Sequence, residues 1–305
     1  MITALSGGVG AARFLTGLLR IVREDELSVV VNTGDDIELF GLHISPDLDI
    51  ITYTLAGIVD EMKGWGIRGD TFRCLEMLKK FGEDTWFSLG DRDLATHLYR
   101  TGQLKQGSTL SQVTNEICAV LGLKSKILPM SNDLFETRIV TPKGSMHFEE
   151  YFVKRHFRDE VLSVEFVGAS SAKPSPGVID ALLDAKVVVV CPSNPIVSIG
   201  TILSVAGVRD ALKQTDARVV AVSPIVAGAP LKGPADKMMR ALGLEVSAYG
   251  VAKLYSDFLD TMVIDIRDVA QKGKIEKLGL GVIVTNTIMK TLEDKVSLAK
   301  SVLQS

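Results

Sequence analysis

The chain of 305 residues is 46% hydrophobic and 23% charged, with a formal net charge of -3, which is ordinary for a globular protein of one large α/β unit or two domains. This charge gives no support for a nucleic-acid or anionic-membrane partner, and the three separated cysteines suggest neither a disulfide framework nor a zinc site. No apolar run approaches the ~20 residues of a membrane span, so we expect a cytoplasmic protein without a signal peptide ahead of its first strand.

The first predicted strand, Ile2 to Leu5, runs into a glycine-rich turn that opens a helix over Ala11 to Ile21. This order of strand, turn and helix is the context in which backbone N–H groups and a helix N-terminus face a phosphate. The alternative is that the glycines serve only close packing and that the arginine extends along the helix surface. The candidate nucleotide and phosphate ligands here are Gly7, Gly8, Gly10 and Arg13.

The second predicted strand, Leu27 to Val31, is followed by four aspartates, Asp35, Asp36, Asp47 and Asp49. These carboxylates would repel one another and a phosphate unless a hard cation such as Mg²⁺ lay between them. We predict a metal or catalytic role for at least two of them. Their spacing suggests that Asp35 and Asp49 reach inward, and the candidate metal ligands are Asp35 and Asp36. The alternative for any single aspartate is a helix cap or an Asx turn.

The middle of the chain has a different pattern, in which several predicted helices are followed by a hairpin. We interpret residues 60–171 as an insertion that caps the active site. Residues 1–59 and 172–305 then form the nucleotide-binding core. The insertion is predicted to hold helices and a hairpin. These elements are Asp70 to Phe81, Leu94 to Arg100 and Leu110 to Leu121 for the helices, with Thr137 to Thr141 and Met146 to Val153 for the hairpin.

A short polar segment inside this insertion carries Asp91, Arg92, Asp93 and His97. The guanidinium could grip a pyrophosphate bidentately, and His97 lies on the same helix face as Asp93. The alternative is that Asp93 is an N-cap and that Asp91 and Arg92 form a surface pair.

Apolar β-branched runs alternate with helical patterns in the last third of the chain. This alternation predicts a Rossmann-like, doubly wound α/β fold with a mostly parallel sheet, whose turns meet at the carboxyl edge where ligands bind. The predicted strands are Lys186 to Cys191, Arg218 to Val222 and Thr261 to Ile266, and the predicted helices are Val178 to Ala185, Thr201 to Lys213, Ala235 to Leu242 and Val251 to Leu259.

Two of the turns in this region are polar. The turn after the most apolar strand offers Ser193, Asn194 and Ser198 to a phosphate, a ribose or a base, although Ser198 could equally be a helix N-cap. The loop from Ser223 to Asp236 is long and rigid, as expected of a loop that closes over a ligand, and Lys232 adds charge to it.

A nicotinamide oxidoreductase is the weaker interpretation of the glycine loop. The dinucleotide form requires a third glycine and an acidic residue that closes the second strand. Arg13 and Asn32 stand at these two positions.

Together, these motifs resemble the 2-phospho-L-lactate transferases of deazaflavin coenzyme F-420 biosynthesis. The match runs nearly end to end, and its aspartate-rich strings are specific. The strings are Leu5-Ser-Gly-Gly-Val-Gly-Ala-Ala-Arg-Phe14, Asn32-Thr-Gly-Asp-Asp36, Ser45-Pro-Asp-Leu-Asp49, Gly64-Trp-Gly66, Leu89-Gly-Asp-Arg-Asp-Leu-Ala-Thr-His97, Pro192-Ser-Asn-Pro195 and Ser223-Pro-Ile225.

The resemblance implies transfer of a phospholactyl-type or phosphoenolpyruvyl-type group from a guanosine diphosphate conjugate. The acceptor is the ribityl hydroxyl of the deazaflavin Fo, GMP is released, and Mg²⁺ is required. It also implies a phosphotransferase-type enzyme that forms a homodimer. Whether the donor carries a lactyl, enolpyruvyl or glyceryl group stays open.

The resemblance also implies roles for single residues. Asp35 would lie at the metal, and Asp49 at the Fo hydroxyl, where a carboxylate could take the proton. Relatives carry a charged residue where Ser88 stands, so the acceptor contact at this position is in doubt. The candidate catalytic residues are Asp49, Asp91 and Arg92, and the candidate Fo ligands are Asp49, Ser88, Asp93 and His97.

A rival interpretation comes from a related branch that shares a similar glycine loop. Its members bind nucleotide sugars and act as regulators without known turnover. The string from Leu89 to His97 and the aspartates on the acceptor side argue against this rival.

Overall fold

A seven-stranded parallel sheet forms the centre of the protein in the computed structural model, which describes residues 1–304. The strand order is β14-β13-β10-β9-β1-β2-β5, and every neighbouring pair is parallel. The strands are β1 (Ile2–Ser6), β2 (Leu27–Val31), β5 (Lys126–Pro129), β9 (Val187–Val190), β10 (Arg218–Val222), β13 (Thr261–Asp265) and β14 (Gly281–Thr285).

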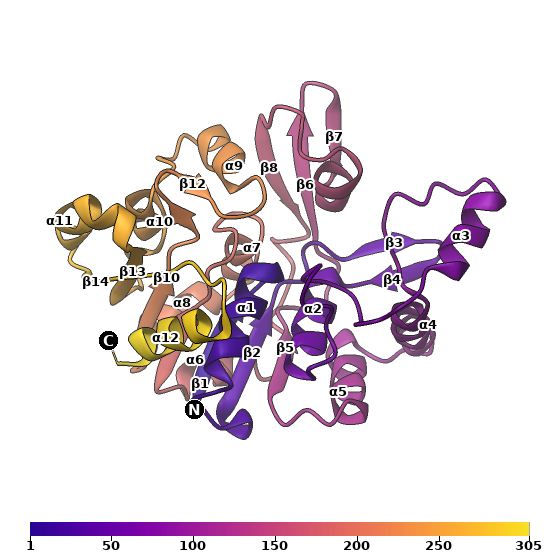
Figure 1. Ribbon diagram of the computed structural model, residues 1–305, viewed down its shortest axis with the longest axis horizontal. Helices are drawn as coiled ribbons and strands as arrows, with labels where there is room; N and C mark the ends of the chain where they lie inside the picture. The colour runs from indigo at the N-terminus through magenta and orange to yellow at the C-terminus, as the bar shows by residue number, and fades with distance from the viewer. Residues whose placement is uncertain (305) are drawn as a thin grey trace.

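The sheet is buried on both faces, which explains the continuous apolar runs of its strands. In β2, Val30 faces one hydrophobic cluster, whereas Val29 and Val31 face the other. Helices cover both faces of the sheet (Figure 1). One face is covered by α1 (Gly8–Leu18), α2 (Pro46–Leu55), α5 (Leu110–Val120) and α12 (Leu292–Leu303). The other face is covered by α6 (Val178–Leu183), α7 (Ile199–Ser204), α8 (Val208–Gln214) and α10 (Ala248–Tyr255).

The chain enters the sheet at β1 and winds outward in both directions, so the strand order reverses between β1 and β9. In doubly wound folds the ligand lies outside the carboxyl ends of the strands at this switch point. The predicted Rossmann-like fold is confirmed, and the glycine loop after β1 and the turn after β9 lie side by side there.

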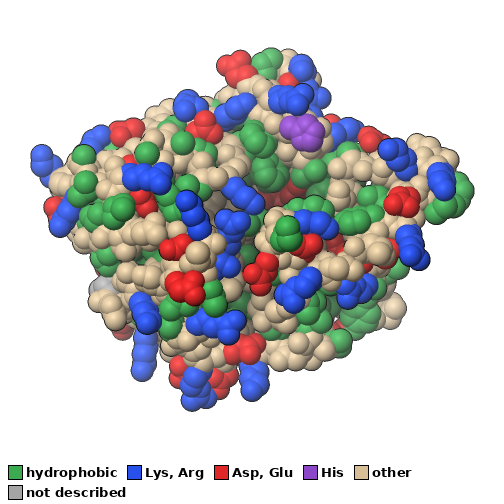
Figure 2. Space-filling model, viewed as in Figure 1, with side chains coloured by type: hydrophobic (Ala, Val, Ile, Leu, Met, Phe, Trp, Pro, Cys, Tyr) green, Lys and Arg blue, Asp and Glu red, His purple; other side chains and the backbone are tan. Residues whose placement is uncertain are grey.

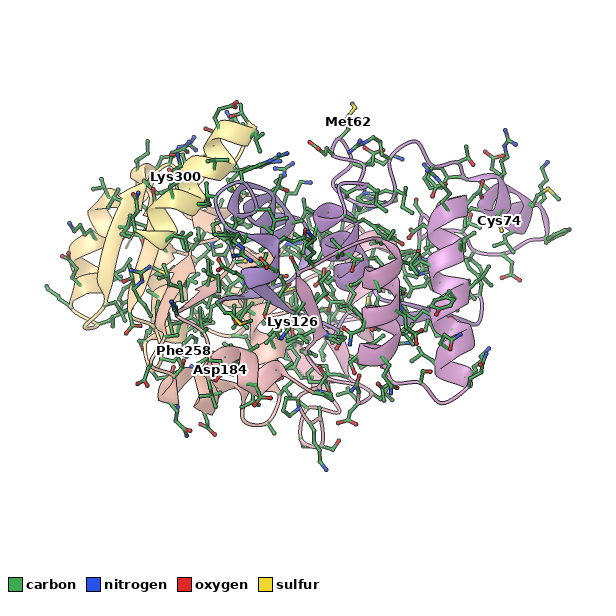
Figure 3. The ribbon with its side chains drawn as sticks, turned by 90° about the horizontal axis from the view of Figure 1, so that it is seen from below. Met62, Cys74, Lys126, Asp184, Phe258 and Lys300 are labelled. Atoms are coloured by element: carbon green, nitrogen blue, oxygen red, sulfur yellow. The ribbon has the colours of Figure 1, made fainter. Side chains whose placement is uncertain are left out.

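Smaller elements rise above the carboxyl edge of the sheet (Figure 1). An antiparallel sheet joins β7 (Gly144–His147), β6 (Glu136–Thr141) and β8 (Ser163–Val167). The hairpin of β3 (Ile37–Leu39) and β4 (Leu42–Ile44) lies beside α4 (Asp91–Lys105) and the short α3 (Arg73–Lys80). Toward the other end lie β11 (Ile225–Val226), β12 (Ala229–Pro230), α9 (Ala235–Ala241) and α11 (Lys272–Glu276). Seen from below, Cys74 on α3 lies at the opposite end of the molecule from Lys300 on α12 (Figure 3).

Three predictions about these elements need correction. The second hairpin strand ends at His147, and Glu150–Lys154 is a π-helical turn, because Phe148, Tyr151 and Phe152 recur at helical spacing and pack inward. The predicted helix over 201–213 is two helices, broken before Gly207, whose φ is +81°. The predicted insertion also contains β5, which belongs to the central sheet.

Within residues 1–304, no helix is both long enough and apolar enough to cross a membrane.

Candidate active site

A cavity of about 820 Å³ opens at the carboxyl edge of the sheet. Its walls come from the glycine loop, the start of α2, the start of α4, the π-helical turn, the turn after β9 and the loop before α9. The space-filling view shows this hollow near the middle of the face, with acidic side chains inside it and Lys and Arg side chains beside it (Figure 2). A large concave site at this edge is where the fold predicts a ligand.

The glycine loop packs directly on the turn after β9. The Gly7 N–H donates to Ser193 Oγ at 3.3 Å, and that hydroxyl donates back to the Gly7 carbonyl at 2.7 Å. A Cβ on Gly7 would lie 2.7 Å from Asp47 Oδ2, and one on Gly10 would lie 2.1 Å from the Pro192 carbonyl oxygen. Close packing therefore accounts for these two glycines.

The loop also leaves a helix N-terminus open to the cavity. Helix α1 begins at Gly8, whose φ is +67°; its N-cap Gly7 offers no side chain, and the Asp47 carboxylate accepts a hydrogen bond from the Gly8 N–H. Its first turn carries no acidic residue, and Gly7, Gly8 and Gly10 all line the cavity. The N–H groups of a first helical turn and the helix dipole form a site for an anion.

Four cationic side chains stand beside this helix N-terminus, and we call this region the cationic end of the cavity. Arg13, Lys232, Lys290 and Lys295 line it, and none of them has an ion-pair partner within 4.0 Å in the described part of the chain. Desolvation, with the neighbouring Arg13 charge, lowers the pKa of Lys232. Cations gathered without carboxylates favour a phosphate-bearing ligand.

Buried carboxylates lie between the cationic end and the rest of the cavity. Asn32 Nδ2 donates to Asp35 Oδ2 at 2.9 Å and to Asp47 Oδ2 at 3.0 Å, and both aspartates line the cavity. Glu149 lines it from the π-helical segment. Burial raises the pKa of Asp47 to about 7 and that of Glu149 to about 8, and burial together with Asp47 raises the pKa of Asp35 well above its usual range.

Asp36, predicted as a metal ligand, does not line the cavity. Its Oδ2 accepts hydrogen bonds from Ser45 Oγ at 2.7 Å and lies 3.0 Å from His43 Nε2. Its carbonyl oxygen lies 3.0 Å from His147 Nε2. Asp36 therefore joins the β3–β4 hairpin to the β6–β7 hairpin. The position beside Asp35 that was predicted for Asp36 is occupied by Asp47.

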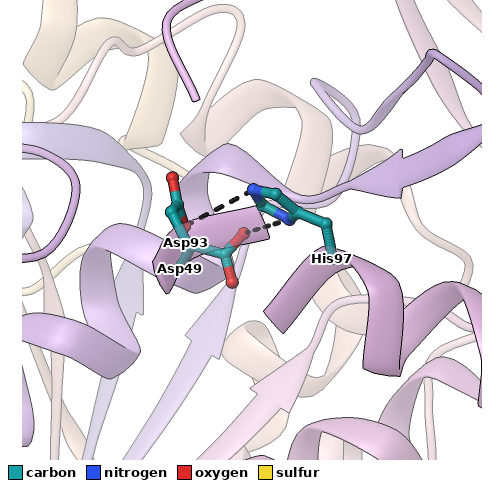
Figure 4. Close-up of side chains that lie close together, drawn as sticks. All are labelled: Asp49, Asp93 and His97. Carbon is teal, nitrogen blue, oxygen red and sulfur yellow. Dashed lines mark ion pairs between the residues drawn. The ribbon is translucent and has the colours of Figure 1, made fainter. Parts of the chain in front are cut away.

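At the far side of the cavity the charged groups are paired, and we call this region the paired end (Figure 4). Arg100 is fully buried and donates to both carboxylate oxygens of Asp49, at 3.1 Å from Nη1 to Oδ2. His97 lies between Asp49 and Asp93, with 3.7 Å from Nδ1 to Asp49 Oδ2 and 3.4 Å from Nε2 to Asp93 Oδ1. Tyr53 donates its hydroxyl to Asp93 Oδ1 at 2.8 Å.

Ligand atoms of Asp49, Asp93 and His97 lie within 4.8 Å of one another, which is a spacing that a metal ion could use. The guanidinium of Arg100 already contacts Asp49 by both oxygens and His97 Nδ1 at 3.3 Å. A divalent cation would have to displace this buried charge, so the paired end is not a metal site. Burial opposes the charge of Arg100, but Asp49 outweighs that effect and raises its pKa.

Asp91 and Arg92, predicted as catalytic, do not line the cavity. Asp91 accepts from the backbone N–H groups of Arg73 at 3.1 Å and Cys74 at 2.9 Å, so it caps α3. The Arg92 guanidinium donates to the Arg68 carbonyl, and its side chain is 58% exposed. The ion-pair partner of Arg92 is Asp70 rather than Asp91, so the expected surface pair is not formed within residues 1–304, and neither residue lines the cavity.

The other predicted ligands do meet at the cavity. Ser88 lines it beside the paired end, and Ser193, Asn194 and Ser198 line it after β9. Asn194 Oδ1 accepts from the Ile196 N–H at 3.0 Å, so this side chain also shapes its own turn. The residues that sequence reasoning missed are Asp47 as partner of Asp35, Tyr53, Arg100, Glu149, Lys290 and Lys295.

The fold and cavity define a Rossmann-like protein with a glycine loop beside buried carboxylates. Comparison with known families then gives the family: residues 2–285 match 2-phospho-L-lactate transferase CofD, and the chain belongs to this family. The family is one of transferases, so the predicted resemblance is confirmed.

Relatives with two different names are equally similar to this chain. It is 43% identical to the phosphoenolpyruvate transferase of Kitasatospora aureofaciens, over 99% of this chain and 96% of the relative. It is also 43% identical to the 2-phospho-L-lactate transferase of Methanococcoides burtonii, over 98% of this chain and 97% of the relative. A solved Bacillus halodurans protein covers 99% of this chain and 98% of its own, with a TM-score of 0.67 and 18% identity, and supports the fold alone.

Proposed function

We propose that this protein transfers a phospholactyl-type or phosphoenolpyruvyl-type group from a guanosine diphosphate conjugate to the ribityl hydroxyl of the deazaflavin Fo, with release of GMP. The observation that carries the proposal is a single cavity with two unlike ends. One end gathers a helix N-terminus and cationic side chains that have no ion-pair partner within 4.0 Å among residues 1–304, and the other offers carboxylates to hydroxyl groups.

The diphosphate fits the cationic end. Transfer from a diphosphate requires that the negative charge on the phosphates be neutralised and the reacting groups be held in line. The N–H groups of α1 and the side chains of Arg13, Lys232 and Lys295 supply the donors for this task. Ser193 and Ser198 lie next to the loop, where a ribose or a phosphate would meet them.

Mg²⁺ fits the carboxylates between the two ends. Asp35 and Asp47 share the Asn32 amide, both side chains are buried, and both pKa values are raised. Such a cluster needs a cation, and Mg²⁺ prefers one or two carboxylates together with phosphate oxygens. When bound, Mg²⁺ would neutralise charge on the diphosphate, with Asp35 and Asp47 holding it and Glu149 nearby.

The ribityl chain fits the paired end. Asp49 and Asp93 line the cavity and accept hydrogen bonds, as a chain of hydroxyl groups requires. The flat ring of Fo would then lie among the aromatic side chains of the same cavity, Trp65, Phe87, Phe148 and Phe152. Both names of the relatives fit this arrangement, because the two donors differ only in the transferred acyl part.

The test is an incubation of the protein with Mg²⁺, Fo and each guanosine diphosphate conjugate in competition, with product masses as the readout. We expect GMP and one phosphodiester of Fo, and the preferred mass identifies the donor. Absence of GMP from the lactyl, enolpyruvyl and glyceryl conjugates, with Fo shown to be bound, would contradict the proposal and favour the regulator of the related branch.

A further inference from the structure

Arg100 has no direct access to the cavity, yet its contacts reach two residues that do. It is 2% exposed, and its guanidinium touches Asp49 through both carboxylate oxygens. Its Nη1 also lies 3.3 Å from Nδ1 of His97, which is 1% exposed. The cavity-lining residues Asp49 and His97 are thus joined behind the cavity wall by one side chain.

The direction of these hydrogen bonds follows from the chemistry of the guanidinium group. Arginine has five N–H donors and no acceptor. The contact with His97 therefore requires that Nδ1 be the acceptor, without a proton. A neutral imidazole carries its single proton on the other nitrogen, Nε2, which lies 3.4 Å from Asp93 Oδ1 and makes no hydrogen bond within residues 1–304.

We propose that Arg100 is a positioning residue that fixes the hydrogen-bonding pattern of the paired end, presenting Asp49 and Asp93 to the cavity as acceptors and keeping His97 in its Nε2–H form. The inference rests on the proposed function for its substrate. It adds that the paired end is built for a polyhydroxyl chain, which donates to both carboxylates.

One consequence is that His97 does not take the proton of the acceptor hydroxyl. Its Nδ1 lone pair is directed at Arg100, and its Nε2 already carries a proton. A second consequence is selectivity, because a ligand that brings only carbonyl or carboxylate oxygens to this end meets like groups on Asp49 and Asp93. Unpaired acceptors in a buried site disfavour such a ligand.

The histidine tautomers can be read directly by NMR of metal-free protein labelled with ¹⁵N at histidine. The chain has four histidines, and His97→Gln identifies the signals of His97. His147 is an internal reference, because its Nδ1 accepts the Glu149 N–H at 3.0 Å and its Nε2 faces the Asp36 carbonyl. We expect both His97 and His147 to show the neutral Nε2–H form.

Arg100→Lys tests the role of the planar guanidinium group, which donates to both carboxylate oxygens of Asp49 and to His97. A single ammonium group keeps the charge but cannot hold two carboxylate oxygens and Nδ1 together. We expect the Nδ1–H form of His97 to appear, while His147 stays unchanged. Misplaced groups cost roughly 10²-fold in rate, so we expect kcat to fall by about that factor while the donor KM changes little. Arg100→Met, if it folds, should give the same pattern with a larger effect.

The matched control is Arg209→Lys. Arg209 forms a similar fork with Asp257, at 2.9 Å and 2.5 Å, outside the cavity. We expect wild-type kcat and unchanged histidine signals.

Three results would each overturn the proposal: a proton on Nδ1 of His97 in the wild type, His97 signals that are the same in Arg100→Lys as in the wild type, or a wild-type kcat in Arg100→Lys. If the tautomers behave as expected but the wild type forms no product, the proposed function fails while the hydrogen-bonding role of Arg100 stands.

Discussion

The two ends of the cavity treat charge in opposite ways. At the cationic end, Arg13, Lys232, Lys290 and Lys295 have no ion-pair partner within 4.0 Å among the residues described. At the paired end, Arg100 and Asp49 form a buried ion pair, and Tyr53 holds Asp93. Unpaired charge indicates that a ligand supplies the partner, whereas paired charge indicates an arrangement formed before the ligand arrives.

This difference predicts that substitutions at the two ends will have different effects on ligand binding and on stability. A lost cation weakens the binding of one ligand and leaves the fold intact, because no protein group depends on it. A lost member of the buried pair leaves an uncompensated charge, which typically costs about 3–5 kcal/mol of stability. The buried carboxylates Asp35, Asp47 and Glu149, which we propose hold Mg²⁺, lie between these cases, since a cation rather than a protein side chain would balance their charge.

The largest expected effect is at these buried carboxylates. We expect Asp35→Asn to lower turnover by roughly 10²- to 10³-fold, the usual cost of removing an electrostatic stabiliser of the transition state. Raising Mg²⁺ should recover part of it, because a charged ligand has become a neutral one. Asp36→Asn is the matched control and should retain most activity. Equal losses in both variants, or full activity of Asp35→Asn at limiting Mg²⁺, would remove Asp35 from the ligand set.

Asp49→Asn tests the paired end. We expect kcat to fall by roughly 10²-fold, because the group that orients and accepts from the hydroxyl is lost, while the KM for the donor barely changes. A melting curve must accompany the kinetics, since Arg100 loses its charge partner. The structure removes the simple capping alternative, because α2 begins at Pro46 rather than near residue 50. A normal kcat would exclude Asp49 from catalysis.

Lys232→Ala tests the cationic end. Charge-assisted hydrogen bonds to phosphate are the strong ones, so we expect the donor KM to rise roughly 10-fold with little change in kcat or in melting temperature. The effect should shrink as salt is added. Lys253→Ala, on α10 and away from the cavity, is the control. A fall in kcat with an unchanged donor KM would place Lys232 elsewhere in the mechanism.

The smallest expected effect is on stability, and its sign follows from the raised pKa values. Asp47 and Glu149 have pKa values of about 7 and about 8 in the folded protein, against about 3.9 and 4.3 when unfolded. Between these limits the folded state binds more protons, so stability is lost as pH rises from about 5 to 8. We expect the melting temperature of metal-free protein to fall across this range.

Mg²⁺ should reverse much of this fall at pH 8, because it stabilises the ionised carboxylates. Glu149→Gln should flatten the pH dependence. A melting temperature that rises between pH 5 and 8 in metal-free protein would contradict the raised pKa values.

The sheet could be predicted from the sequence because its central strands are buried on both faces. The continuous apolar runs of β2, β9, β10 and β13 follow from that burial. The edge strand β14 was not predicted, although Val282, Ile283 and Val284 form a β-branched run that gave an available signal. Strand β5 has only four residues, Lys126–Pro129, which is a short run to recognise.

The site was predictable where a ligand lies in a turn directly after a strand. Gly7, Asp35 and Ser193 are of this kind, because parallel strands bring their carboxyl ends to one edge. Glu149 was not predictable, because only the packing of the β6–β7 hairpin against the sheet edge brings it to Asp35. Arg100 had an available signal, since Asp93, His97 and Arg100 recur at positions i, i+4 and i+7 of one helix face.

We propose that one cavity holds the donor diphosphate and Fo together, with the metal between them. Mn²⁺ in place of Mg²⁺ tests this directly, because it speeds the relaxation of nearby ligand protons. With GDP as the donor probe and Fo present, we expect the ribityl protons of Fo to relax faster than its ring protons, and Asp35→Asn to weaken the effect. Relaxation rates of the Fo protons that do not change with Mn²⁺, or displacement of Fo by GDP, would contradict this arrangement.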